Sequence, residues 1–261
     1  MTANTSEAAV LSRRRVYIGL PAYNEELALP RVLGRIAQLI ENLDAEIVVV
    51  VYDDGSTDGT ASIAGQWQSR LPLVALDGVQ NRGLGVGLRT LVEYAVTHGE
   101  ESDVLVIMDC DDTHDPGQIP EMIATMDRGA DIVIASRFTR RSLVRGVSPL
   151  RQVTAIGAAT LFKLIHPIGG VWDYTCGYRA YSVGTLKAAS LHYRGALVRE
   201  TGFACMVELL LKLNALGFRA AEIPLQLRYD QKPTASKMRV SSNIRRLLVL
   251  LIKWRVAGFG T

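Results

Sequence analysis

The chain has 261 residues, of which 48% are hydrophobic, with 9 prolines and a formal net charge of +3 at pH 7. This composition excludes a disordered or fibrous protein and provides enough apolar residues for one large core. The three cysteines, Cys110, Cys176 and Cys205, are widely spaced and form no C-x-x-C pair. Their number and spacing argue against a disulfide framework or a zinc site and favour a reducing cytosol.

The N-terminal residues 1–14 are polar and lack the apolar core of a signal peptide, so they are predicted to form a loose tail. The apolar run "LLVLLI" at 247–252 is far shorter than the about 18 residues that a membrane-spanning helix requires. We therefore expect a cytoplasmic protein without a membrane-spanning helix.

In the first half of the chain, short apolar runs alternate with helical patterns. The runs predict strands that are covered on both faces, at residues 16–20, 46–54, 73–77, 104–109 and 131–136. Asn24 is the expected N-cap of the first intervening helix, with Glu25 and Glu26 in its first turn. Further helices are predicted at about 59–69, 86–98 and 118–127. This alternation predicts an α/β fold with a mostly parallel, doubly wound sheet and helices on both faces.

The second half has a different pattern. It predicts a helix at 151–166, a strand or bend in "YTCGYRAYS", a helix in "FACMVELLLKLNALG" that Gly217 ends, and one strand in "FRAAEIPLQLRY". A basic amphipathic helix is expected at 241–261, where it could lie in a membrane interface or pack on the core.

Polar motifs follow four of the predicted strands: "PAYNEE", "DDGSTDGT", "QNRGLGVG" and "DCDD". Ligands of doubly wound sheets bind beyond the carboxyl ends of the strands. Four separate loops are therefore predicted to converge on one ligand-binding crevice.

The stretch "VIMDCDDTHDP" at 106–116 crowds four aspartates together. Asp109 and Asp111 could both bind one hard divalent cation, which would relieve their mutual repulsion; a solvated acidic turn is the alternative. Asp54 could bond a base or ribose edge. The glycines of "NRGLGVG" could admit a phosphate close to the backbone, or could merely pack a helix onto the sheet. Together these loops indicate a nucleoside diphosphate.

Acidic residues are absent from two long zones, 132–172 and 231–261, which hold six and seven Lys or Arg residues respectively. A solvated basic face would explain this pattern, but we favour contact with phosphates or with an anionic membrane surface.

Eight motifs occur in order between residues 16 and 250, and they resemble family 2 glycosyltransferases of the GT-A fold. The chain is most similar to the dolichyl or polyprenyl-phosphate mannose synthase group of that family. The motifs are "LPAYNEE", "VVYDDGSTDGT", "NRGLGVGLRTLVEYA", "VIMDCDDTHDP", "IASRF", "DYTCGYRAYS", "ELLLKLNALGFRAAEIPLQLRY" and "SKMR".

The resemblance implies a role for each matching residue. Nucleotide-binding residues would be Pro21, Tyr23, Glu25, Asp53, Asp54, Gly83 and Asp109. Asp109 and Asp111 would bind Mg²⁺ or Mn²⁺ on the donor diphosphate. Arg137, Arg151 and Lys237 would hold the acceptor phosphate. The catalytic set would be Asp109, Asp111, Asp173 and Arg137.

Two further carboxylates and several arginines allow more than one interpretation. Asp173 could face the sugar or the acceptor, or could be structural. Glu208 interrupts an apolar helix, so it is either a site residue or a buried carboxylate paired with an arginine. His114 is expected to be structural, and Arg140, Arg141 and Arg145 to be ordinary surface residues.

We therefore predict one GT-A catalytic domain at 15–240, with a nucleotide-binding half at 15–136 and an acceptor half at 137–240. The expected reaction is metal-dependent, inverting transfer of a single hexose, with mannose from GDP-mannose as the first choice, to a polyprenyl or dolichyl phosphate. Expected partners are the nucleotide sugar, the lipid phosphate, the cytoplasmic membrane face and a membrane subunit, but no nucleic acid. A UDP-hexose is the other candidate donor.

Two alternatives remain. A soluble glycosyltransferase could modify a hydroxyl of a small metabolite or glycan, with Asp173 or Glu208 as the base. A sugar-nucleotide-binding module without turnover is the other, and the intact D-x-D motif argues against it.

Overall fold

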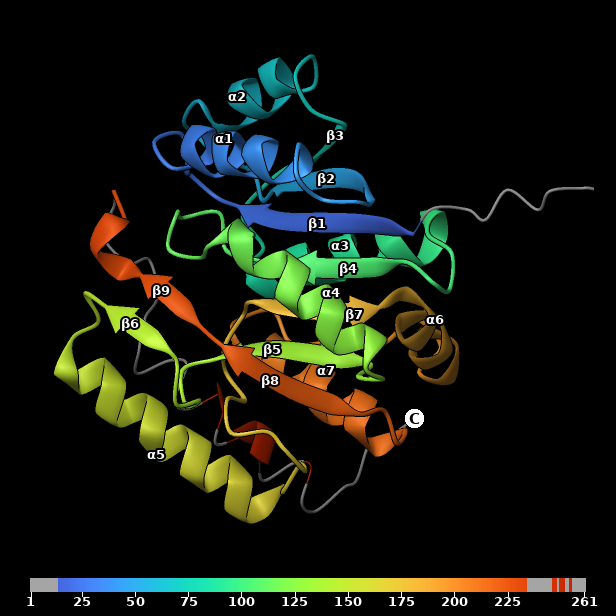
Figure 1. Ribbon diagram of the computed structural model, residues 1–261, viewed down its shortest axis with the longest axis vertical. Coiled ribbons are helices and arrows are strands. Elements are labelled where there is room, and N and C mark those ends of the chain that lie inside the picture. The colour runs from blue at the N-terminus through green and yellow to red at the C-terminus, as the bar shows by residue number, and fades with distance from the viewer. Residues whose placement is uncertain (1–13, 234–245, 248, 252–253, 255–261) are drawn as a thin grey trace, which may run out of the picture.

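The computed structural model describes residues 14–233, 246–247, 249–251 and 254. A seven-stranded sheet forms its centre, in the order β3-β2-β1-β4-β7-β5-β8 (Figure 1). The first half of the chain supplies β1 (Arg15–Ala22), β2 (Glu46–Asp53), β3 (Leu73–Asp77), β4 (Val104–Ile107) and β5 (Ile132–Ser136). The predicted mostly parallel α/β sheet is confirmed.

One strand of the second half, β7 (Arg179–Ser182), lies between β4 and β5 and runs antiparallel to both. The strand β8 (Ala220–Pro224) then pairs parallel with β5 at the sheet edge. A central strand of the sheet therefore comes from a segment that the sequence patterns describe only as a strand or bend.

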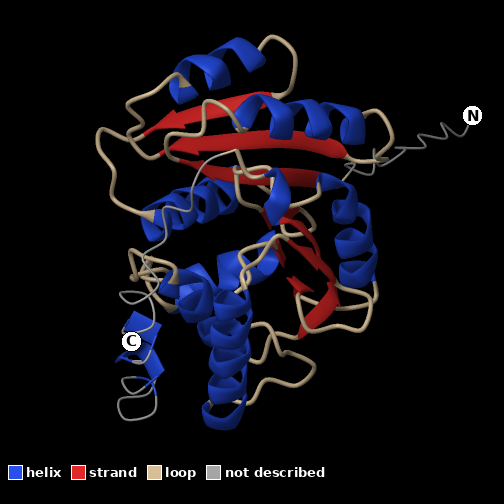
Figure 2. Cartoon of the chain, turned by 90° about the vertical axis from the view of Figure 1, so that its left-hand side faces the viewer, coloured by secondary structure: helices blue, strands red, loops and turns tan. Residues whose placement is uncertain are grey.

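Helices cover both faces of the sheet (Figure 2). Figure 1 shows α1 and α4 in front of the strands and α3 and α7 behind them. The helices of the first half are α1 (Leu29–Ile40), α2 (Thr60–Trp67), α3 (Leu84–His98) and α4 (Ile119–Asp127), the last preceded by the short 3-10 helix η1 (Pro116–Gln118). The second half adds α6 (Val183–His192) and α7 (Ala204–Ala215). This two-sided cover explains why β4 and β5 are buried at every position.

A second, smaller unit lies beside the large sheet. The strands β6 (Leu143–Arg145) and β9 (Gln226–Arg228) pair in parallel, and the long helix α5 (Pro149–Ile165) lies alongside (Figure 1). A 3-10 helix, η2 (Tyr229–Gln231), follows β9. The single strand predicted for "FRAAEIPLQLRY" is wrong, because Leu225 separates β8 from β9 and the two strands belong to different sheets.

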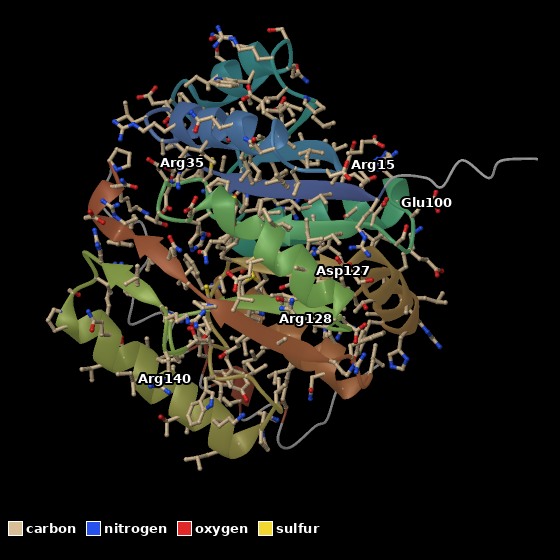
Figure 3. The ribbon with its side chains drawn as sticks, viewed as in Figure 1. Arg15, Arg35, Glu100, Asp127, Arg128 and Arg140 are labelled. Atoms are coloured by element: carbon tan, nitrogen blue, oxygen red, sulfur yellow. The ribbon has the colours of Figure 1, made fainter. Side chains whose placement is uncertain are left out.

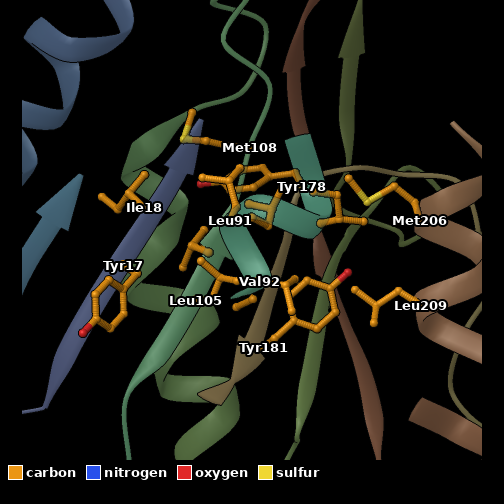
Figure 4. Packing of buried hydrophobic residues seen from close by; sticks show 14 of the residues in the cluster. Tyr17, Ile18, Leu91, Val92, Leu105, Met108, Tyr178, Tyr181, Met206 and Leu209 are labelled. Carbon is orange, nitrogen blue, oxygen red and sulfur yellow. The ribbon is translucent and has the colours of Figure 1, made fainter. Parts of the chain in front are cut away.

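The hydrophobic core is one cluster that occupies both faces of the sheet, with buried residues from α1 and α4 as well as from α3 and α7. Figure 4 shows Leu91 of α3 and Leu209 of α7 packed with Leu105 and Tyr181 from the strands. All three cysteines are free and buried, and burial raises the pKa of the Cys176 and Cys205 thiols to about 12. These thiols are therefore structural apolar groups rather than nucleophiles.

The start of α1 differs from the prediction. Ala28, and not Asn24, is the N-cap, and no acidic residue lies in the first turn. Asn24 has a left-handed backbone with φ of 53°, and its Oδ1 accepts a hydrogen bond from the Thr57 N–H at 2.8 Å. The Asn24 side chain, which could cap a helix, instead links the loop after β1 to the loop after β2.

At the C-terminus, Arg246, Leu247, Val249 to Leu251 and Trp254 have helical geometry, and the rest of the predicted helix lies outside the described residues. Leu250 and Leu251 are buried, and Leu247 and Trp254 pack against the core. The described part of this segment therefore packs on the protein. No helix within the described ranges is long and apolar enough to cross a bilayer.

Candidate active site

The first two polar loops meet at the carboxyl ends of β1 and β2. These strands pair in parallel, with Pro21 opposite Tyr52 and Ala22 opposite Asp53. The Glu25 N–H donates to Thr60 Oγ1 at 2.8 Å, and the Asn24 N–H donates to Ser56 Oγ at 2.8 Å. The two loops that carry five of the predicted nucleotide contacts therefore form one connected unit.

Asp53 and Asp54 are buried and order this unit. Asp53 Oδ1 accepts the Ser56 N–H at 3.0 Å. The Asp54 carboxylate accepts the N–H groups of Arg82 at 3.0 Å and Gly83 at 2.7 Å, and so fixes the loop that begins α3. Both carboxylates shape the loops around the predicted nucleotide site.

Two glycines at the start of α3 are required because the backbone of residues 200 and 201 approaches them closely. Gly83 has a φ of 92°, and a Cβ there would lie 2.6 Å from the Thr201 carbonyl oxygen. A Cβ on Gly85 would lie 1.8 Å from the Glu200 carbonyl oxygen. The Gly85 N–H also donates to the Thr201 carbonyl at 2.9 Å. At Gly83 and Gly85 the close approach expected for a ligand is made by residues 200 and 201, which precede α7. Only Gly87 packs α3 onto the sheet, since a Cβ there would lie 3.1 Å from Pro21 Cβ and 3.2 Å from the Tyr52 ring.

The crowded aspartates after β4 separate into two pairs. Arg35 of α1 donates to Asp112 Oδ1 at 3.2 Å and to Asp115 Oδ1 at 2.7 Å. Figure 3 shows Arg35 at the end of the sheet opposite Arg15, where β1 begins. Arg35 therefore compensates two of the four negative charges and leaves Asp109 and Asp111 as the pair that faces a cavity.

Asp111 already has a cationic partner. Lys232 Nζ donates to Asp111 Oδ2, and Thr113 Oγ1 donates to Asp111 Oδ1 at 2.6 Å. Burial alone would raise the pKa of Asp111, but the Lys232 ammonium holds it below its usual value. The backbone N–H of Asp109 donates to His114 Nδ1 at 3.1 Å, and the His114 ring stacks on Tyr178. His114 thus supports the turn, as expected.

Asp109 and Asp111 fit a hard divalent cation, because both supply carboxylate oxygens to one cavity. The described residues include no group of three or more His, Cys, Asp or Glu side chains able to hold a metal. The remaining ligands would therefore be water and phosphate oxygens, as is usual for Mg²⁺ bound with a phosphorylated substrate.

The cavity beside these aspartates has a volume of about 580 Å³ and extends to α5. Its lining includes three cationic residues, Arg137, Arg151 and Lys232. The rest of the wall is largely apolar, with side chains from β6, α5, β9, the segments next to them and the C-terminal segment: Val144, Val147, Ile156, Leu225, Leu227 and Leu247. The cavity suits a ligand with an anionic head and an apolar body.

Arg137 and Asp173 form a bidentate ion pair. The Nε of Arg137 donates to Asp173 Oδ2 at 2.8 Å and its Nη2 donates to Oδ1 at 2.5 Å. Asp173 is fully buried, and its Oδ1 also accepts the Cys176 N–H at 2.9 Å. Although burial alone would raise the pKa of Asp173, the guanidinium holds it below the usual range. Arg137 lines the cavity, whereas Asp173 stands behind it and orients the arginine.

Tyr229 links the other two cations of the cavity. Arg151 Nη1 donates to Tyr229 Oη at 2.5 Å, and the Arg151 guanidinium lies 5.3 Å from the centre of the tyrosine ring. Lys232 Nζ lies 5.6 Å from the same ring centre. Lys237, the third expected phosphate anchor, lies outside the described residues.

Glu208 is a buried carboxylate with a structural set of partners. It pairs with Lys212 at 2.7 Å and accepts the N–H groups of Arg199 and Glu200, both at 2.8 Å. The partner is a lysine one helical turn away, and not the arginine that the sequence suggested. Glu208 therefore holds the segment whose residues 200 and 201 press against α3.

Sequence reasoning missed Arg35, Lys232 and Tyr229. Arg35 stands 77 residues before Asp112, and Lys232 stands 121 residues after Asp111. The route of β9 brings the last two residues to the site, because the Arg228 N–H donates to the Thr113 carbonyl at 2.9 Å and Leu227 bridges His114. The acid-free zone 231–261 is the signal in the sequence that includes Lys232.

Comparison with known proteins gives a consistent result. Residues 17–187 match the family model described as Glycosyl transferase family 2. The chain is 28% identical to a polyprenol monophosphomannose synthase of Mycolicibacterium smegmatis, over 98% of this chain and 92% of that one. It is 32% identical to an undecaprenyl-phosphate mannosyltransferase of Micrococcus luteus, over 94% and 95% of the two chains.

Among solved structures, the fold is similar to that of glucosyl-3-phosphoglycerate synthase from Mycobacterium tuberculosis in complex with Mn²⁺, uridine diphosphate and phosphoglyceric acid. The TM-score is 0.65 at 21% identity, over 93% of this chain and 78% of that one. At this identity the likeness establishes the fold alone.

Proposed function

The chain belongs to glycosyl transferase family 2 and is a glycosyltransferase, and from this we propose that it transfers one hexose from a nucleotide sugar to a polyprenyl phosphate. We propose mannose, supplied as GDP-mannose, because both relatives described above are named for transferring mannose to a prenyl phosphate.

The cations of the cavity are the observation that carries this proposal. Arg137, Arg151 and Lys232 line the same cavity as Asp109 and Asp111. A phosphate acceptor is already anionic, so it needs cationic anchors and no general base. The apolar wall beyond the cations would accommodate the start of an isoprenoid chain.

The alternative acceptor, a neutral hydroxyl, would need a carboxylate base within hydrogen-bond reach. Both expected candidates are occupied elsewhere: Asp173 is fully buried against Arg137, and Glu208 pairs with Lys212. Neither lines the cavity. This arrangement supports the lipid phosphate over a metabolite or glycan hydroxyl.

In the proposed mechanism, Asp109 and Asp111 would hold Mg²⁺ or Mn²⁺. When bound, the cation would stabilise the charge that develops on the departing nucleoside diphosphate. The unit around Pro21, Tyr23, Glu25, Asp53 and Asp54 would hold the nucleoside, with Gly83 beside it. Arg137 and Arg151 would aim the acceptor phosphate at the anomeric carbon, so that a single in-line displacement inverts its configuration.

Purified protein should therefore form an organic-extractable sugar lipid when given radiolabelled GDP-mannose, polyprenyl phosphate and Mg²⁺ or Mn²⁺. UDP-glucose in parallel tests the donor, and polyprenol without phosphate is the matched control for the acceptor. A water-soluble product, donor hydrolysis alone, or equal transfer to polyprenol would contradict the proposal.

We also propose that α5 contacts the cytoplasmic membrane face. Five of its exposed residues recur about every three or four positions and carry no charge: Val153, Ile156, Gly157, Thr160 and Leu164. The exposed Pro149 and Gln152 of the first turn are also uncharged. Val153 is 65% exposed and Leu164 is 76% exposed. The two charged groups of α5 are engaged elsewhere, Arg151 with Tyr229 and Lys163 with the carbonyls of Ile168 and Val171. An uncharged, exposed helix face beside a lipid-binding cavity suits a membrane interface.

The substitution Leu164→Glu should lower binding to anionic lipid vesicles by about tenfold or more, because a fully buried leucine contributes about 1.5–3 kcal/mol. Vesicle co-sedimentation measures this. Leu191→Glu is the matched control, since Leu191 is 82% exposed on α6, which lies away from α5 (Figure 1). Equal losses for the two variants would contradict a specific contact through α5.

A further inference from the structure

Lys232 occupies an unusual place for a lysine. Its ammonium contacts Asp111 Oδ2, and the side chains of Lys232 and Asp111 are only 12% and 11% exposed. The pair thus lies within the carboxylate set that a divalent cation would use. A positive charge of the protein itself already compensates one of these two aspartates.

Both oxygens of Asp111 are in use, because Oδ1 accepts the N–H and the Oγ1 hydroxyl of Thr113 and Oδ2 accepts the Lys232 ammonium. A divalent cation that binds Oδ2 therefore competes with the ammonium. Two positive charges a few ångströms apart repel one another strongly in a partly buried site. A cation that binds Asp111 must therefore move the ammonium away. The lysine stem is long and flexible, so this movement requires no change in the backbone of η2, which Lys232 follows.

The surroundings of Lys232 define where the displaced ammonium can go. The ammonium already lies over the Tyr229 ring, and the Arg151 guanidinium contacts the same ring. Lys232, Arg151 and Arg137 line one continuous cavity. An ammonium that leaves Asp111 therefore stays beside the two arginines that face an anionic ligand.

We infer that Lys232 is a resident counter-ion of Asp111, which the metal must displace and which then joins Arg137 and Arg151 at the acceptor phosphate. Lys232 is thus a positioning residue that couples the two subsites: the phosphate end is complete only once the metal is bound at the other. This inference rests on the proposed function, since it concerns the same metal and acceptor.

Metal binding to the nucleotide-free protein tests this directly. Titration with Mn²⁺ alone, followed by electron paramagnetic resonance of the free ion, should show about tenfold tighter binding for Lys232→Gln than for wild type. A hydrogen bond to a charged group contributes about 1.5–3 kcal/mol, and a tenfold change corresponds to about 1.4 kcal/mol. Removal of the competing ammonium would account for the gain.

Two variants control for other effects. Lys232→Arg keeps a cation that can pair with Asp111, so its Mn²⁺ affinity should stay within about threefold of wild type. Arg145→Gln removes one positive charge from an exposed position on β6 and should also stay within about threefold. A gain equal to that of Lys232→Gln in Arg145→Gln would reduce the effect to net charge and overturn the inference.

Thermal unfolding gives a second readout and verifies folding. Without metal, Lys232→Gln should unfold at a lower temperature than wild type, because Asp111 then lacks its cationic partner and repels Asp109. Mn²⁺ should raise the unfolding midpoint of this variant by more than that of wild type. Unchanged or weaker Mn²⁺ binding by a folded Lys232→Gln would overturn the inference alone. If wild type binds no Mn²⁺ even with GDP present, the metal-dependent function itself is contradicted.

Discussion

The Asp111→Asn substitution is expected to lower the rate of sugar transfer about a thousandfold, because a metal ion supplies several kcal/mol of charge stabilisation and about 4 kcal/mol corresponds to that factor. Asparagine keeps the size of the side chain but removes the charge that Asp111 would contribute to the cation. Initial rates with saturating donor and acceptor, at several Mn²⁺ concentrations, measure the effect.

Asp112→Asn is the matched control for this experiment, since the same chemical change is made one residue later. Asp112 pairs with Arg35 and has a φ of 63°, a conformation that asparagine tolerates well. Its activity should stay within about tenfold of wild type, the effect of weakening one charged hydrogen bond. Similar losses in the two variants would contradict the division of the four aspartates into a metal pair and an Arg35 pair.

The second large effect concerns stability. Asp173→Asn should lower the free energy of unfolding by about 3–5 kcal/mol, because it leaves the Arg137 guanidinium without its buried partner. For a chain of this size, that corresponds to a fall of roughly 10 °C in the unfolding midpoint. Urea denaturation followed by circular dichroism measures the change.

The pH dependence of this difference follows from the direction of the pKa shift. The Arg137 charge holds the pKa of Asp173 below its usual value, so the pair stabilises the folded state above the pKa of the unfolded chain, about 3.9. The stability difference between wild type and Asp173→Asn should therefore be constant from pH 7 to about 5. It should shrink as the pH falls below about 4, through the lower pKa of the folded state.

A different outcome would indicate that Asp173 takes part in the transfer reaction. If Asp173→Asn unfolds like wild type but loses transfer, with a pH profile that loses its acidic limb, the carboxylate acts on the acceptor. Asp173 would then be the general base that a hydroxyl acceptor requires.

Much of the fold could be predicted because each strand of the first half is apolar at nearly every position. The strand "VLVI" of β4 and the "IVIAS" of β5 are recognisable without any partner in view. The three-residue strands β6 and β9 are too short for a periodic signal, and α6 went unpredicted between two stronger patterns. Asn24 satisfied a local rule for caps, but its amide oxygen is used by Thr57 of the next loop.

The candidate site was likewise predictable only where a local sequence pattern specifies it. Asp109 and Asp111 could be identified because their ligand chemistry depends on a spacing of two residues. The partners that decide their charge state come from α1 and from the segment after β9, and no local pattern specifies such pairings. Asp173 illustrates the limit most clearly: the motif includes the residue, but only the structure shows that Arg137 lies between it and the cavity.

The position of β7 has a consequence for synthesis of the chain. Because residues 179–182 separate β4 from β5, these two earlier strands have no hydrogen-bonded neighbour in common until that segment has left the ribosome. A nascent chain that ends at residue 136 would expose one unpaired edge of β4 and both edges of β5. The sheet can therefore be completed only late in translation. Unpaired edges invite aggregation, so fragments that end between the two halves should be insoluble.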